Sequence, residues 1–116
     1  MDSKTRTYQF ALRIMRFIDN LPKDISTKVI SGQLLRSATS IGANITEAKS
    51  SSSRKDFINF FNHALKSANE TKYWLQLLKD SKKAEVETIS LLISEIEEIS
   101  NILASSILTL KDQRKI

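Results

Sequence analysis

The chain has 116 residues, of which 41% are hydrophobic and 27% are charged, and its formal net charge is +5. This length predicts one domain with a single core, because two cores would each be too small. The absence of cysteine excludes disulfides, thiolate metal ligands and cysteine nucleophiles. No apolar run approaches the roughly 20 residues of a membrane span, and the first residues do not resemble a secretory signal. We therefore expect a soluble cytoplasmic protein with no membrane association.

Two glycines and one proline are the only strong helix breakers, which favours long helices. Apolar residues at helical spacing predict a first helix over residues 4–20. This helix ends because Pro22 disfavours helical geometry at Leu21. A second helix is predicted over residues 25–48, and the serine run that follows favours a turn.

The third helix is predicted to begin after Ser53, its expected N-cap, and to continue to about Lys79. Residues 80–83 form the last break, and an apolar seam from Val86 to Leu110 marks a fourth helix. Short connections place neighbouring helices antiparallel. We predict an all-α fold, an antiparallel up-down-up-down four-helix bundle that forms a single domain over residues 1–116.

The apolar arcs of the first and third helices are each about 200° wide, whereas one bundle interior uses little more than about 100°. This surplus predicts self-association through exposed apolar side chains. The alternative is a monomer that tolerates scattered surface aromatics. The candidate interface residues are Phe10, Phe17, Ile58, Phe60, Leu65 and Trp74.

A narrow ribbon of polar side chains borders the apolar face of the second helix, where groups are expected to be partly buried and hydrogen-bonded. If the second and third helices form a hairpin that turns near Ser51, this ribbon faces polar residues of the third helix. The predicted levels pair Gln33 with Glu70, Arg36 with Ser67, Ser40 with His63 and Asn44 with Asn59.

Arg36 and Glu70 are the expected ion pair of this polar seam, and Glu47 is expected near Arg54 and Lys55 at the turn. We interpret the seam as a network that specifies packing, with a ligand site or active site as the alternative. The seam comprises Gln33, Arg36, Ser40, Asn44 and Glu47 on the second helix and Asn59, His63, Ser67 and Glu70 on the third.

A catalytic di-metal centre in a four-helix bundle needs Glu-x-x-His pairs, whereas the residue three before the only histidine, His63, is Phe60. His63 is therefore expected to be a hydrogen-bonding residue of the surface or the seam. Two isolated glycines cannot build a phosphate-binding loop. We expect no enzymatic activity, no cofactor and no metal.

The positive charge lies in the first three helices, because residues 84–116 carry six acidic and three basic side chains. A basic stripe on the first helix and a basic cluster at the serine turn suit phosphate contacts that tolerate any sequence of RNA or DNA. One alternative is that basic and acidic helices complement each other within the bundle. Another is a scaffold or accessory subunit that docks a protein partner. The candidate nucleic-acid contacts are Arg6, Arg13, Arg16, Lys49, Arg54 and Lys55.

Two linked motifs lie in residues 33–70, namely Gln33-x-x-Arg36-x-x-x-Ser40-Ile41-x-x-Asn44-Ile45-x-Glu47, then Ser53-x-x-Asp56-Phe57-Ile58 with Ala64-x-x-Ser67-x-x-Glu70. This pattern resembles the bacterial four-helix bundle proteins encoded in intervening sequences of large-subunit (23S) rRNA genes, which are related to accessory proteins of diversity-generating retroelements. The resemblance implies a cytoplasmic bacterial protein, a ring-like homopentamer and nucleic-acid association without known catalysis. The chain departs from the family pattern at two positions. Ala48 stands where relatives commonly have glycine, so either the second helix extends or the following loop loosens. Gly42 stands where relatives often have proline, so a kink there is less strictly enforced.

Overall fold

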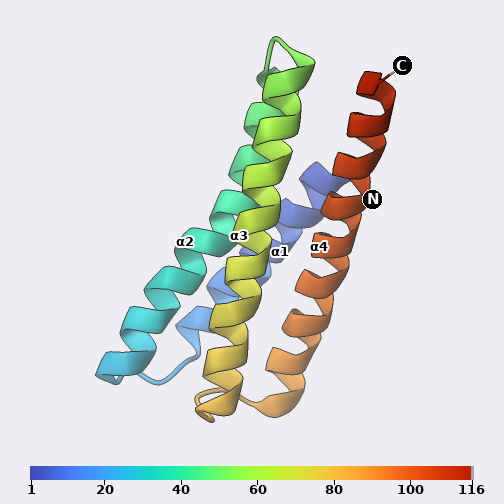
Figure 1. Ribbon diagram of the computed structural model, residues 1–116. Coiled ribbons are helices and arrows are strands. Elements are labelled where there is room, and N and C mark those ends of the chain that lie inside the picture. The colour runs from blue at the N-terminus through green and yellow to red at the C-terminus, as the bar shows by residue number, and fades with distance from the viewer. Residues whose placement is uncertain (116) are drawn as a thin grey trace.

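The computed structural model describes residues 1–115, with side chains described through residue 112, so the predicted domain end at residue 116 lies outside it. Within these residues the chain forms four helices (Figure 1): α1 (Ser3–Asp19), α2 (Ile25–Ser50), α3 (Arg54–Asp80) and α4 (Val86–Lys115). α1 and α3 each pack against both α2 and α4. The predicted all-α, up-down-up-down four-helix bundle is confirmed. No helix in the described part of the chain has the length and apolarity needed to span a membrane.

Side-chain caps define where the helices begin. Asp2 Oδ1 accepts the Thr5 N–H at 2.8 Å at the start of α1, and Asp24 Oδ1 accepts the Thr27 N–H at 3.0 Å at the start of α2. Ser53 is the N-cap of α3, as predicted. These side chains satisfy backbone donors that have no partner in the first helical turn.

The second helix continues to Ser50, two residues beyond its predicted end. Its last turn contains Ala48 where the resemblance implies a glycine in relatives, and alanine favours the helix that glycine would interrupt. The turn to α3 is consequently short, and the α2–α3 hairpin extends beyond α1 at one end of the bundle (Figure 1).

The wide apolar arcs face the interior of the bundle, because α1 and α3 each contact two neighbouring helices. The interface prediction was therefore wrong for three of its six residues, which are buried within the chain. The other three are partly buried and pack against the same core. Phe10, Phe17 and Ile58 are 0%, 8% and 3% exposed to solvent, whereas Phe60, Leu65 and Trp74 are intermediate in burial.

Gly42 of α2 lies against Thr7 of α1. A Cβ at this position would lie 3.3 Å from Thr7 Oγ1. Thr7 is buried, and its hydroxyl donates to the Ser3 carbonyl at 2.8 Å. A larger residue at position 42 would therefore press against a side chain with little freedom to move.

Candidate nucleic-acid interface and polar seam

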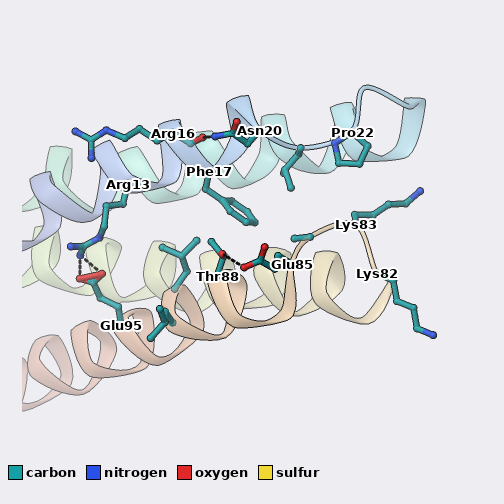
Figure 2. A pocket seen from close by; sticks show the side chains of 14 residues that line it. Arg13, Arg16, Phe17, Asn20, Pro22, Lys82, Lys83, Glu85, Thr88 and Glu95 are labelled. Atoms are coloured by element: carbon teal, nitrogen blue, oxygen red, sulfur yellow. Dashed lines mark hydrogen bonds and ion pairs between the residues drawn. The ribbon is translucent and has the colours of Figure 1, made fainter.

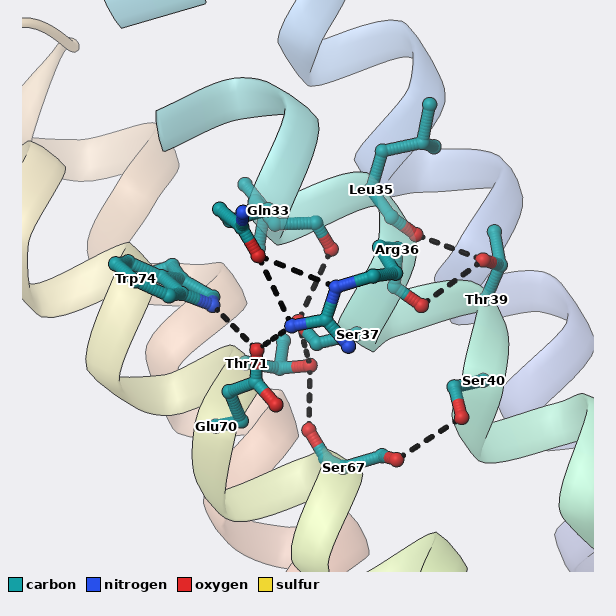
Figure 3. A network of polar contacts seen from close by, with 11 residues as sticks. Gln33, Leu35, Arg36, Ser37, Thr39, Ser40, Ser67, Glu70, Thr71 and Trp74 are labelled. Carbon is teal, nitrogen blue, oxygen red and sulfur yellow. Dashed lines mark hydrogen bonds and ion pairs between the residues drawn. The ribbon is translucent and has the colours of Figure 1, made fainter. Parts of the chain in front are cut away.

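The predicted Arg36–Glu70 ion pair joins α2 to α3 (Figure 3). Gln33 Oε1 accepts hydrogen bonds from Arg36 Nε at 3.2 Å and Nη2 at 3.0 Å. On the other side, Trp74 Nε1 donates to Glu70 Oε2 at 2.9 Å. The Arg36 and Glu70 side chains are 57% and 35% exposed, so solvent screens their attraction. The cluster orients four side chains but leaves them accessible to water.

The seam continues through hydroxyl and amide groups toward the α2–α3 turn. Ser67 Oγ donates to Ser40 Oγ at 3.0 Å, and Asn44 Nδ2 donates to Ser40 Oγ at 3.0 Å. The prediction that Ser40 lies level with His63 was wrong by about one helical turn. Each side chain tilts toward the N-terminus of its own helix. In an antiparallel hairpin, a side chain therefore contacts a residue that comes later in the partner helix than the residue level with its own backbone.

A buried contact between Ser37 and Thr71 lies beneath the exposed part of the seam (Figure 3). Both side chains are fully buried. Thr71 Oγ1 donates to Ser37 Oγ at 2.9 Å, and Ser37 Oγ donates to the Leu34 carbonyl at 3.2 Å. This pair was not predicted from the sequence. The signal that could have revealed it is the hydroxyl of Thr71, which follows Ala64 and Ala68 at the helical spacing of the buried face of α3.

Three residues of the predicted seam lie outside the network. Glu47, Asn59 and His63 are exposed, and the hydrogen bonds found among the described residues do not include their side chains. The ion pairs formed by these residues likewise do not join Glu47 to Arg54 or Lys55. The side chains of α2 contact α3 residues about one turn later than predicted, so His63 and Asn59 do not meet Ser40 and Asn44.

The basic stripe of α1 is partly neutralised by the acidic helix α4. Arg13 forms an ion pair with Glu95 (Figure 2), and Arg6 Nη2 lies 3.5 Å from Glu98 Oε1. These two ion pairs support the alternative in which the charges of a basic helix and an acidic helix complement each other within the bundle. Arg16 extends away from the α4 carboxylates (Figure 2), and no ion pair among the described residues includes it. The three arginines therefore do not form one free cationic surface.

A groove of about 970 Å³ lies between α1 and α4 beside the Arg13–Glu95 pair. The Phe17 ring points into it (Figure 2), and Leu91 and Leu92 contribute apolar walls from α4. Its lining lacks histidine and holds no adjacent pair of carboxylates. In the described part of the chain, no three metal-binding side chains gather closely enough to hold an ion.

The cations at the α2–α3 turn have a different environment. Lys49, Arg54 and Lys55 are exposed, and the ion pairs found among the described residues do not include them. Glu47 and Asp56 lie in the same stretch of chain and reduce its net positive charge. The turn therefore offers three solvated cations at one end of the bundle.

Aromatic and hydroxyl groups accompany these cations. Lys49 Nζ lies 5.6 Å from the centroid of the Phe57 ring, which stacks on Phe61 at 4.9 Å. A cavity of about 410 Å³ beside them is lined by the serines of the turn, Arg54, Phe57 and Leu110. Cations can contact phosphates, and neighbouring aromatic rings can stack on bases, without recognition of a particular base sequence.

Four antiparallel helices, a polar seam between α2 and α3 and cations at their turn define this molecule as a small helical-bundle protein. A family model described as 23S rRNA-intervening sequence protein matches residues 1–105, and the chain belongs to this family. It is also similar to a crystal structure of a protein of unknown function from the S23 ribosomal protein family of Bacteroides thetaiotaomicron. The two are 44% identical with a TM-score of 0.83, over 91% of this chain and 98% of that chain. A comparison with curated proteins gives no match. The predicted membership of the 23S rRNA intervening-sequence family is thus confirmed.

Proposed function

We propose that the protein is a non-enzymatic, self-associating helical bundle that binds the backbone of RNA or DNA in the bacterial cytoplasm. The observation that carries this proposal is the group of exposed cations at the α2–α3 turn, Lys49, Arg54 and Lys55. Carboxylates of α4 neutralise Arg6 and Arg13. Protein cations that bind phosphates release the counterions condensed on the nucleic acid, and the cations of the turn are not already paired with carboxylates, so the turn is the stronger binding surface.

Membership of the family supports nucleic acid as the partner, because the family name refers to 23S rRNA intervening sequences. The described chain has no recognition motif that reads a particular base sequence. Backbone contacts from flexible lysine and arginine side chains are therefore the expected mode, and affinity should fall as salt rises.

Self-association cannot use Phe10, Phe17 and Ile58, because these three candidate interface residues are buried within the chain. The outer face of α2 offers one, because Arg36 is the only charged residue in the stretch 29–46. Val29 and Leu35 are 59% and 36% exposed on this face, and the exposed Ala43 allows a neighbouring helix to approach closely. We propose that this face packs against a second copy, and that five copies form a ring. A ring repeats the basic turn, and this repetition raises avidity.

Light-scattering mass measurement at low salt, with and without a short RNA or DNA, tests both parts. A homopentamer of 13.2 kDa chains has a mass of about 66 kDa, and bound nucleic acid adds to that mass. The double variant Arg54→Gln and Lys55→Gln should bind less. The control Lys23→Gln and Lys28→Gln removes the same charge at the other end of α2 and should bind normally. A monomer that never gains mass with nucleic acid contradicts the proposal.

The alternative is a scaffold that docks a protein partner. The observation that favours it is the groove between α1 and α4, where Leu91 is 73% exposed. This reading predicts that substitution of Leu91 by Ser removes partner binding, whereas the nucleic-acid proposal predicts that the same variant keeps its affinity for RNA and DNA.

A further inference from the structure

We propose that the outer face of α3 is a track for single-stranded nucleic acid. The inference rests on the proposed function and names the form of nucleic acid and the surface that receives it. The track begins beside the basic turn and continues along the helix. It comprises Lys55, Asn59, Asn62, Lys66, Asn69 and Tyr73.

These six residues follow one another at alternating steps of four and three, which places them in one stripe about 80° wide and about 27 Å long. α3 packs on α2 and α4 with its other side, and α1 lies behind it (Figure 1). Asn62 is half-buried, Tyr73 is 60% exposed, and the other four side chains are exposed. Five of the six side chains are therefore open to solvent, and Asn62 is the least accessible member of the stripe.

The chemistry of the stripe suits a strand whose bases are unpaired. Its lysines can contact phosphates, and its amides can both donate to and accept from sugars and base edges. Tyr73 meets the Trp74 ring edge-on, with ring centroids 5.0 Å apart, and can stack a base. Base pairing in a duplex would hide the edges that these amides can reach.

No carboxylate lies within the stripe, and the only acidic residue between Asp56 and Asp80 is Glu70. Glu70 is held to one side by Arg36 and Trp74. The carboxylates that border the track are therefore Asp56, beside its first residue, and Glu70, which is already paired. A length of about 27 Å accommodates about four or five nucleotides, within the range of known single-strand sites.

The three asparagines of the stripe do not contribute to the fold. Asparagine is a poor residue for a helix interior, because its side chain competes for backbone hydrogen bonds. Asn44 is compensated by its bonds to Ser40. Among the hydrogen bonds that the described residues form, none includes the side chain of Asn59, Asn62 or Asn69. Residues that lower stability without a structural partner are expected where a surface is used for binding.

The test replaces Asn59, Asn62 and Asn69 together by alanine and measures melting and binding at low salt. The probes are a fluorescent uridine-rich RNA, a thymidine-rich DNA and a duplex of equal length. We expect the melting temperature to rise by about 5 °C, while affinity for single strands falls at least tenfold. The matched control replaces Ser94, Asn101 and Ser105 on the exposed face of α4 by alanine. It should also melt higher but keep its affinity.

The outcomes separate the inference from the proposed function. If single strands bind and the triple Asn→Ala variant keeps wild-type affinity, the track is refuted while the proposed function stands. Equal affinity for duplex and single strand, or a lower melting temperature of the variant, also refutes it. Failure of the wild type to bind any of the three probes refutes both.

Discussion

Glu70 is the junction of the polar seam, because Arg36 and Trp74 donate to it from two directions. Exposure of 57% and 35% limits the Arg36–Glu70 ion pair to about 0.5–1 kcal/mol. The Trp74 bond to a partly exposed carboxylate adds about 1–1.5 kcal/mol. We therefore expect Glu70→Ala to lower the free energy of unfolding by about 2 kcal/mol. Arg36→Ala should cost about 0.5–1 kcal/mol and should add little when Glu70 is already absent.

Urea unfolding of the wild type, both single variants and the double variant gives the coupling energy between Arg36 and Glu70, which is the difference between the double variant's loss of stability and the sum of the two single losses. The only tryptophan, Trp74, reports the transition because its indole lies within the seam. The exposed pair Lys72–Glu97, with exposures of 48% and 49%, is the control and should couple by less. Coupling between Arg36 and Glu70 no larger than in this control would refute the account. An Arg36→Met variant with unchanged melting and unchanged assembly mass would refute a role for the seam in specifying packing.

Two further predictions concern the backbone and pH. Gly32→Ala should stabilise α2 by about 1 kcal/mol, because nothing lies within 4 Å of the new Cβ. Gly42→Ala should gain less than half as much, because its new Cβ would lie close to Thr7 Oγ1. Equal gains in melting temperature would contradict this difference. The Thr27 N–H bond lowers the pKa of Asp24 below its ordinary value. A depressed folded-state pKa stabilises the protein above the unfolded pKa, so stability should fall as pH drops below about 4. Melting curves of Asp24→Asn should show a weaker fall across this acid range, and an unchanged fall would contradict the assignment.

Local chemistry allowed much of the fold to be predicted from the sequence. Pro22 and Ser53 mark helix boundaries through backbone constraints that do not depend on the rest of the fold. Arg36 and Glu70 could be paired because both have long side chains that tolerate an error in register. Short side chains lack that reach, so the partner of Ser40 was misplaced by about one turn.

The remaining features depend on how helices pack in three dimensions. The width of an apolar arc does not reveal how many neighbours a helix contacts, and Phe10 was therefore assigned to the surface although it is fully buried. The Arg13–Glu95 pair joins the first and last helices, whose relative rotation is not encoded in local spacing. Gly42 is explained by the close approach of Thr7, which appears only when the crossing of α1 and α2 is known.

The central claim is that cations at the α2–α3 turn bind a nucleic-acid backbone. Fluorescence anisotropy of a labelled single-stranded RNA, measured over a range of salt concentrations, tests it most directly. We predict that log K falls linearly with log salt. Removing Arg54 and Lys55 as glutamine variants should make the slope less steep by at least about 1.4, because each lost phosphate contact contributes about 0.7 for a single strand. The Lys23→Gln and Lys28→Gln control should keep the wild-type slope. Binding that is independent of salt, or equal slopes in all three proteins, would contradict the account.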